Sequence, residues 1–328
     1  MRRREFIRLL VGSTAAAWPL AVRAQHTTVP KIGILTSRAA GDAPQLMDAI
    51  RQGLKDTGFV EGQNVAIEYR FAEHHYERLP ALAADLVQRQ VTMIVATTTQ
   101  AALAAKAATT TIPVVFEMGS NPVRLGLVAS LNRPGGNITG ATQLTVELAP
   151  KRLQLLHELI PAASVIALLI NPTDPASSEP QIDAVLSAAH SLGLELHILN
   201  ASADHDFDGV FANLIQLGVS GLVISGDAFL VSRSRQLAAL AVHHAMPVVG
   251  EYREFVAAGG LASYGGGIAD AYRLTGLYAG RVLKGEKPAD LPVQQATKVE
   301  LYINLKTAKA LGISVPIPIL GRADEVIE

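Results

Sequence analysis

The sequence predicts an α/β protein made of two doubly wound, Rossmann-like parallel-sheet lobes joined by a hinge. The chain has 328 residues, enough for two domains of about 150 residues each. Hydrophobic residues make up 49% of the chain and aromatic residues only 5%, so the core is aliphatic. Short apolar segments alternate with helical patterns of about 10–15 residues, which is typical of βαβ units, and the alternation starts again near residue 150.

The first half begins with an unbroken apolar run at residues 31–35, which is typical of a strand buried on both faces. Leu46, Ile50 and Leu54 then recur at helical spacing, and Gly58 supplies a stop. The later elements of this half are expected as strands at 65–69, 93–96 and 113–116, helices at 79–87 and 100–108, and a short helix starting at Pro122.

The second half repeats this alternation after a probable crossing between the lobes near residues 144–149. Its strands are expected at 164–170, 194–198, 221–225, 247–249 and 261–264, and its helices at 150–160, 182–189, 207–217, 230–244 and 268–284. Gly259 and Gly260 permit a tight return across the hinge. We therefore expect a first lobe at 29–145 plus about 258–290 and a second lobe at 146–257 plus about 291–328.

Residues 1–24 have the pattern of an export signal. Arginines fill positions 2–4, an apolar stretch follows at 9–20, and small residues predict cleavage after Ala24. The run at 3–8 is similar to the twin-arginine signature, with the general secretory route as the alternative. Because the apolar stretch has about 12 residues and a membrane span needs about 20, we expect a mature protein in the periplasm.

Composition and motifs exclude several classes of protein. The sequence has no cysteine, which excludes disulfides, thiolate metal sites and a cysteine nucleophile. The formal net charge is −1, and loss of residues 1–24 would leave −5, so nothing favours nucleic acid as a partner. The sequence has neither a P-loop nor a Gly-x-Ser-x-Gly elbow. Adjacent histidines at 74–75 and 243–244 point in different directions, so we expect no metal, and we expect no cofactor.

Small polar residues at the carboxyl ends of strands are the strongest functional signal. Ligands of open parallel sheets bind at these ends, and hydroxyls and N–H groups at a helix start attract a carboxylate. The candidates in the first lobe are Ser37, Thr98, Thr99, Ser120, Asn121 and, near the crossing, Thr142. The candidates in the second lobe, which could accept from an ammonium, are Asn171, Asp227 and Tyr252.

Each of these residues also has an ordinary structural explanation. Ser, Thr, Asn and Asp commonly cap helices, so a single one is weak evidence for a site. Tyr76 or Tyr264 either stacks on an aromatic ligand or is simply packed. The set as a whole, spread over both lobes, predicts a site for a zwitterion.

Several longer segments carry a resemblance to a known family. They are residues 58–65, 121–123, 127–131, 133–140, 258–265, 291–295, 303–312 and 322–328. With them the chain resembles the periplasmic ABC-transporter substrate-binding proteins of the tryptophan/tyrosine type, which have a type I periplasmic-binding fold. One position departs from the pattern, because Asn121 stands where the family often has aspartate.

The resemblance implies the solute-binding component of an ABC importer, which closes two lobes over a small molecule and delivers it to a permease in the inner membrane. The expected ligand is an aromatic or branched-chain amino acid or a related small carboxylic acid, and the expected state is a monomer. Two alternatives stay open. One is a receptor for a sensor system without transport, and the other is a periplasmic enzyme that uses Asp227 or Glu251.

Overall fold

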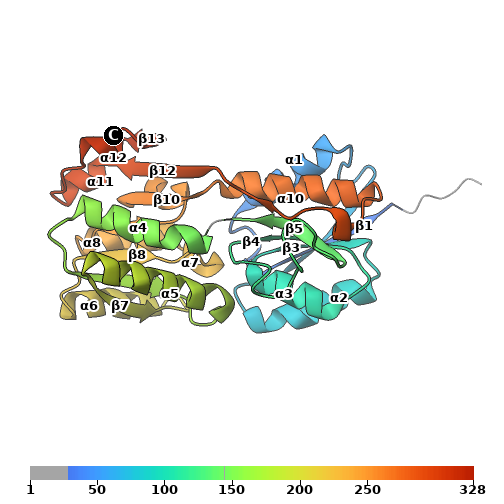
Figure 1. Cartoon of the computed structure of the whole chain (residues 1–328), viewed down its shortest axis with the longest axis horizontal. Coiled ribbons are helices and arrows are strands. Elements are labelled where there is room, and N and C mark those ends of the chain that lie inside the picture. The colour runs from blue at the N-terminus through green and yellow to red at the C-terminus, as the bar shows by residue number, and fades with distance from the viewer. Residues whose placement is uncertain (1–28, 144) are drawn as a thin grey trace, which may run out of the picture.

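Two α/β lobes lie side by side along the long axis of the molecule (Figure 1). The computed structural model describes residues 29–143 and 145–328, so the predicted export signal lies outside the described residues. The first lobe has a six-stranded sheet in the order β11-β5-β4-β3-β1-β2, and the second has a seven-stranded sheet in the order β13-β12-β10-β9-β8-β6-β7. The predicted architecture of two doubly wound lobes is confirmed.

The first sheet is entirely parallel. Its strands are β1 (Lys31–Thr36), β2 (Ala66–Phe71), β3 (Met93–Thr97), β4 (Val114–Met118), β5 (Ile138–Thr142) and β11 (Gln294–Gln295). Apolar side chains run through its central strands because helices cover both faces. One face packs on α1 (Pro44–Asp56) and α10 (Ile268–Leu283), the other on α2 (Leu79–Gln88) and α3 (Thr99–Ala108).

Two glycines let α1 and α10 approach each other closely. A Cβ on Gly53 would overlap with the carbonyl oxygen of Arg273, and one on Gly276 would overlap with that of Ile50. This close packing fixes α10 against the first lobe, although the strand before it belongs to the second.

The second sheet is parallel except where β10 pairs with β12. Its strands are β6 (Val165–Ile170), β7 (Glu195–Asn200), β8 (Gly221–Ile224), β9 (Val248–Gly250), β10 (Ala262–Gly266), β12 (Val299–Asn304) and β13 (Glu325–Ile327). Its helices are α4 (Thr145–Leu159), α5 (Pro175–Leu192), α6 (Asp206–Gln216), α7 (Ala228–Ser232), α8 (Ser234–His243), α9 (Arg253–Ala257), α11 (Leu305–Ala310) and α12 (Ile317–Leu320).

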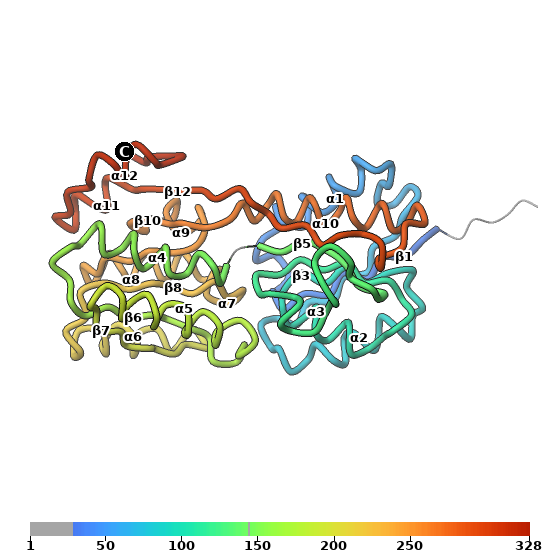
Figure 2. The backbone as a smooth tube through the Cα atoms, viewed as in Figure 1, coloured from blue at the N-terminus to red at the C-terminus, as the bar shows by residue number. Residues whose placement is uncertain are grey.

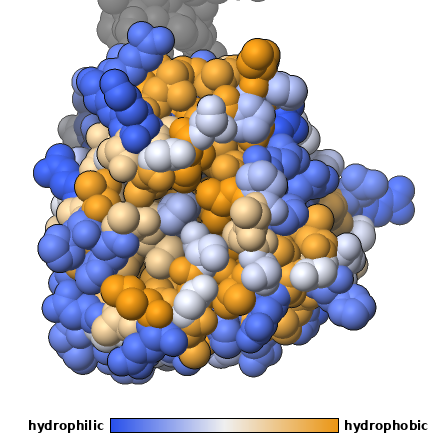
Figure 3. All heavy atoms as spheres, turned by 90° about the vertical axis from the view of Figure 1, so that its left-hand side faces the viewer, coloured by the Kyte–Doolittle hydropathy of each residue, from blue (hydrophilic) through white to orange (hydrophobic). Residues whose placement is uncertain are grey.

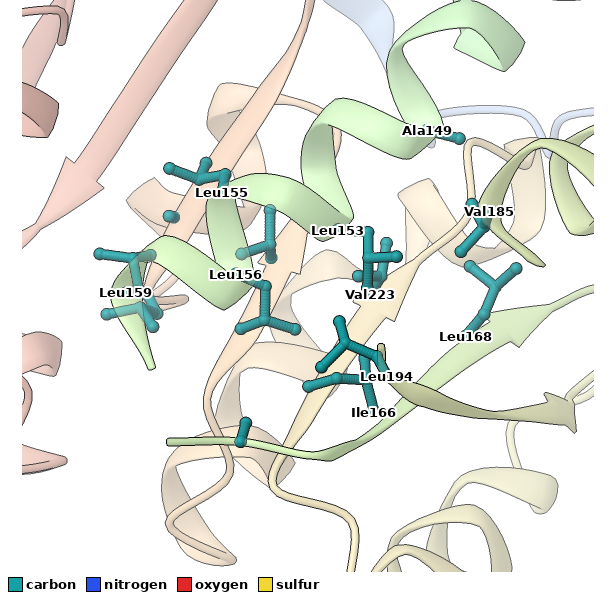
Figure 4. Packing of buried hydrophobic residues seen from close by; sticks show 14 of the residues in the cluster. Ala149, Leu153, Leu155, Leu156, Leu159, Ile166, Leu168, Val185, Leu194 and Val223 are labelled. Atoms are coloured by element: carbon teal, nitrogen blue, oxygen red, sulfur yellow. The ribbon is translucent and has the colours of Figure 1, made fainter. Parts of the chain in front are cut away.

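The core of the second lobe is aliphatic, as the composition predicts. Leucines of α4 pack onto β6 and β8 together with residues of α5 (Figure 4). Its other face packs on α6 to α9. Figure 3 looks at the end of this lobe that is remote from the first lobe, where hydrophobic and hydrophilic side chains are interspersed. In the described part of the chain, no helix is both long enough and apolar enough to cross a membrane.

The chain passes between the lobes three times (Figure 2). The crossings join β5 to α4, β10 to α10, and β11 to β12. The two later crossings differ from the sequence prediction. Residues 262–266 pair with β9 and β12 in the second sheet, so the return to the first lobe comes at Gly267 and not near 258. The last crossing comes after β11, because Gln294 and Gln295 still pair with β5.

Local hydrogen bonding explains these differences. Gly259, with φ of 106°, and Gly260 turn the chain from α9 into β10 within the second lobe, so they are not part of the hinge. The short helix expected at Pro122 is wrong as well. Residues 122–129 form successive turns, in which the N–H groups of Leu127 and Val128 both bond to the carbonyl of Pro122.

Candidate functional site

The carboxyl ends of both parallel sheets face each other across a cleft between the lobes. Residues of both lobes enclose a cavity of about 50 Å³ at its centre. A cavity of this size holds no more than a few water molecules, so a ligand enters only when the lobes move apart. Ligand sites in other proteins are typically about 300–1,000 Å³.

The first lobe supplies hydroxyls and a helix start to this cavity. Ser37 follows β1, Thr98 caps α3 by accepting from the N–H of Ala101 at 3.3 Å, and Ser120 follows β4. Thr99 donates to the Ser120 hydroxyl at 3.1 Å, so the two loops are joined. These groups lie at the positive end of the α3 dipole, where an anion is stabilised.

Arg38 adds a positive charge that the sequence analysis missed. The residue is only 6% exposed and lines the cavity from the loop after β1. Its Nε lies 3.3 Å from the hydroxyl of Tyr272, and no described residue pairs with its terminal nitrogens. The guanidinium therefore has donors left for a ligand acceptor.

A buried acid lies close to Arg38 on the same lobe. Glu117 is the last residue but one of β4, and burial raises its pKa to about 7, against the attraction of Arg38 and a hydrogen bond from Gln143. Gln143, from the first crossing, also accepts from the Tyr252 hydroxyl of the second lobe at 2.9 Å. The floor of the cleft is thus a polar network that includes part of the hinge.

Two aspartates form the second-lobe side. Asp227 accepts from the N–H groups of Phe229 and Leu230 at 2.9 and 3.1 Å, which starts α7, and from Asn171 at 3.2 Å. Asp174 caps α5 and is 7% exposed. Burial, with the nearby charge of Asp227, raises the pKa of Asp174 to about 6. Two neighbouring buried acids form an acceptor for a cation.

Hydrogen bonds across the cleft hold the lobes together in this structure. Tyr76, in the short 3₁₀ helix Tyr76–Arg78, donates to Asp227 at 2.8 Å. Gln100 donates to Asp174 at 2.7 Å, and the hydroxyls of Ser120 and Ser177 lie 3.3 Å apart. Each bond joins a first-lobe donor to a second-lobe acceptor, so the cleft is closed.

Most predicted site residues meet at this cleft. The cavity is lined by Ser37, Thr98, Thr99, Ser120, Asp227 and Tyr252. Asn171 lies just behind, where it bonds to Asp227. Tyr76 reaches the site through its hydroxyl, which donates a hydrogen bond to Asp227.

Three predicted residues lie away from the cavity. Thr142 is buried at the end of β5 opposite Met118. Asn121 is exposed and accepts from the N–H groups of Val123 and Arg124, so it stabilises a turn. Tyr264 packs on the core of the second lobe and borders a separate surface pocket, because β10 belongs to the second sheet.

Two of the residues that were missed have a weak signal in the sequence. Arg38 directly follows a predicted site residue, and Asp174 lies three residues after another, next to a proline that starts a helix. Glu117 directly follows the strand expected at 113–116, and its neighbours in β4 are apolar, so nothing marked it as a site residue. Charged residues so placed can only be recognised once the lobes are assembled.

A buried ion pair supports the site from behind. Arg152 is fully buried in α4, and its Nη1 lies 3.5 Å from Glu251. Arg152 also donates to the carbonyls of Thr145 and Tyr264 at 2.9 and 3.3 Å, next to the first two crossings. The pair therefore anchors the hinge, and Glu251 does not line the cavity.

Two α/β lobes that close over a polar cleft, joined by three crossings, define the class of type I two-lobed binding proteins, an architecture shared with solved periplasmic binding proteins. The chain matches the family described as ABC transporter substrate binding protein over residues 35–327, and it belongs to this family. The predicted resemblance is confirmed, and so is the prediction of a binding protein in place of an enzyme.

Relatives with known ligands are similar over most of the chain. A "Tyrosine-binding protein" of Clostridioides difficile is 28% identical over 263 residues, which cover 80% of this chain and 75% of that protein. An ABC domain from Streptococcus pneumonia, solved in complex with L-Trp, is 25% identical, covers 91% of this chain and 99% of its own, and has a TM-score of 0.81.

A third relative was solved without ligand. A substrate binding protein with adhesive properties from Clostridium difficile, in its ligand-free, open structure, is 25% identical, covers 92% of this chain and 99% of its own, and has a TM-score of 0.65. This TM-score is lower than that of the L-Trp complex, although identity and coverage are nearly equal.

Proposed function

We propose that this protein captures an amino acid between its lobes in the periplasm and delivers it to an ABC permease of the inner membrane. The observation that carries the proposal is the division of charge across the cleft. The first lobe presents Arg38 and N–H donors beside one acid, Glu117, whose pKa burial raises to about 7, whereas the second lobe presents two buried carboxylates. A ligand with a carboxylate at one end and an ammonium at the other satisfies both.

The carboxylate binds on the first lobe. Thr98 and Thr99 lie at the start of α3, a ten-residue helix whose dipole favours negative charge there, and Ser37 lines the same cavity from the loop after β1. Arg38 adds a formal positive charge in a buried setting, where charge-assisted hydrogen bonds are about twice as strong as neutral ones.

The ammonium binds on the second lobe between Asp174 and Asp227. Asp227 keeps its helix-capping bonds, and its other oxygen, which accepts from Tyr76, faces the cleft. The interaction is most favourable at Asp174, because burial disfavours its ionised carboxylate and a neighbouring cation stabilises it. A ligand that touches both lobes at once favours the closed state over the open one.

Three findings support an amino acid as the ligand. Two relatives are described with tyrosine and L-Trp, and the site has acceptors and donors for both ends of a zwitterion. An aromatic or branched-chain amino acid remains our leading ligand, with a small carboxylic acid next. The export signal predicted at residues 1–24 supports the periplasm as the compartment.

The test measures binding of the mature protein to L-tyrosine, L-tryptophan and L-leucine by calorimetry, alongside tyramine and 3-(4-hydroxyphenyl)propionate. The two analogues lack the carboxylate and the ammonium respectively, so each should bind at least about tenfold more weakly than tyrosine. Residues 25–328 contain no tryptophan, so tryptophan fluorescence released on denaturation of the purified protein would report a co-purified indole.

A pair of variants separates the site from general effects. Asp227→Asn keeps a residue that caps helices but removes the charge, and should weaken tyrosine binding about tenfold or more. Asp208→Asn, on an exposed position of α6, is the matched control and should bind as the wild type does. If tyramine or the propionate binds as tightly as tyrosine, the zwitterion assignment is wrong.

A further inference from the structure

A second, larger cavity adjoins the first on the side of α1. Its volume is about 530 Å³, and both lobes line it, with the start of α1 on one side and α7 to α9 on the other. The two cavities share Arg38, Val231, Tyr252 and Ile268. These four residues therefore form a partition between the two cavities. A side chain of a ligand bound in the first cavity can extend past this partition into the second.

Two helices begin at this second cavity without a side-chain cap. The first is α1, with Ala43 at its N-cap, and the other is α8, with Arg233 at its N-cap. They have 13 and 10 residues and come from opposite lobes, and residues at both starts line the cavity. Pro44, the first residue of α1, has no N–H, and the N–H of Leu46 bonds to the carbonyl of Ala43, so α1 contributes mainly its dipole. The dipoles of both helices favour an acceptor with negative charge between them.

Arg38 provides an independent indication of an anion. The residue is 6% exposed, lines both cavities, and uses only Nε of its guanidinium in a bond within the described chain. Four further N–H donors remain, enough for two acidic groups. Glu117 attracts this cation without forming an ion pair with it, so its donors favour a ligand acceptor on each side of the partition.

The other charges at this cavity do not cancel that of Arg38. Asp42 is held by His74 at 2.7 Å and lies 3.9 Å from Arg233, which also pairs with Asp204. Glu254 is exposed to solvent, where its charge is screened, and Arg235 opposes it on the same rim. Glu117 attracts Arg38 from the first cavity, but the two form no ion pair and Glu117 does not line the second cavity. Among the charged residues that line the second cavity, Arg38 is therefore the buried one without an ion pair in the described chain.

From these observations we infer that the ligand carries a second acidic group on its side chain, which binds in this cavity between the starts of α1 and α8. The inference rests on the proposed function and adds the class of amino acid: one with an acidic arm that passes the partition beside Arg38. Arg38 then lies between the two acidic groups, and Arg235 contacts the outer one.

The experiment compares ligands that differ only in the acidic arm. Calorimetry of the mature protein with L-phenylalanine and 4-carboxy-L-phenylalanine, and with L-glutamine and L-glutamate, gives one affinity ratio for each pair. We expect the acidic member of at least one pair to bind about tenfold or more tightly. Arg235→Gln should reduce this ratio at least about threefold, whereas Arg133→Gln, which removes an exposed arginine elsewhere, should leave it unchanged.

A second pair of variants tests the location. Ala257→Phe places a ring into the cavity and should weaken binding of the preferred acidic ligand about tenfold. Ala239→Phe, at an exposed position of α8 outside the cavity, is its control. If neutral amino acids bind and the acidic arm adds nothing, the inference is overturned and the proposed function stands. If no amino acid binds, neutral or acidic, both are overturned.

Discussion

Replacement of Asp174 by asparagine tests whether the cleft is built to receive a cation. Burial and the charge of Asp227 raise the pKa of Asp174 from 3.8 to about 6. A raised pKa means that the stabilising contribution is complete below about 3.8 and is lost as the pH rises through about 6. At about pH 8 the ionised carboxylate therefore destabilises the folded protein by about 3 kcal/mol.

Asparagine removes that cost and preserves the local structure. It has the same shape, and its oxygen can still accept from the N–H of Ser177 and the amide of Gln100. The ligand-free variant should therefore unfold about 5 °C higher than the wild type at about pH 8. Ligand affinity should move the other way, because the loss of one charge-assisted bond costs about 1.5–3 kcal/mol, or roughly 10- to 150-fold in Kd.

Thermal unfolding without ligand and calorimetry with tyrosine measure the two effects. Asp183→Asn, at an exposed position of the same helix, is the control and should change neither quantity. In the wild type, affinity should also fall as the pH drops below about 6, because Asp174 takes up a proton, and the variant should lose this dependence. A less stable Asp174→Asn, or one with unchanged affinity, would refute the reasoning.

Three further perturbations address the supports of the site. Arg152→Met leaves Glu251 buried without its cation and should cost about 3–5 kcal/mol in urea unfolding, whereas the double change with Glu251→Gln should recover most of that loss. Gly226→Ala puts a Cβ into the carboxylate of Glu251 and should cost about 1–3 kcal/mol, while Gly209→Ala, in the open on α6, should be neutral or stabilising. Because burial raises the pKa of Glu117 to about 7, stability should fall between about pH 5 and 8, and Glu117→Gln should flatten that decline; an unchanged pH profile in this variant would contradict the assignment.

The sequence predicted the fold well because its signals are local. An apolar run such as residues 31–35 has to be covered on both faces, and a parallel sheet with helices on each side is the arrangement that does so. The crossings were placed less well. Gly259 and Gly260 indicate a turn in any context, and only the pairing of β10 with β9 and β12 shows that this turn lies inside the second lobe.

The part of the candidate site that was predicted also rests on local sequence signals. Ser37 and Thr98 were found because they directly follow strands, and Asp227 because it lies in the loop after β8, positions that sequence patterns reveal. Arg38 and Glu117 were missed because their role depends on what the second lobe brings close to them. Tyr264 was misplaced as a site residue because the lobe that contains β10 was assigned wrongly.

The groups that bind ligand are the same groups that hold the lobes together. Tyr76 and Gln100 occupy Asp227 and Asp174 in the closed structure, and each such bond is worth about 0.5–1.5 kcal/mol net of water. Together these two bonds contribute about 1–3 kcal/mol to the closed state. A ligand that spans the cleft then needs a preference of about 5.5 kcal/mol for the closed form to move the lobes from almost fully open to almost fully closed. One carboxylate and one ammonium, each bound by buried charged partners, can supply that difference, whereas a ligand with only one of them cannot.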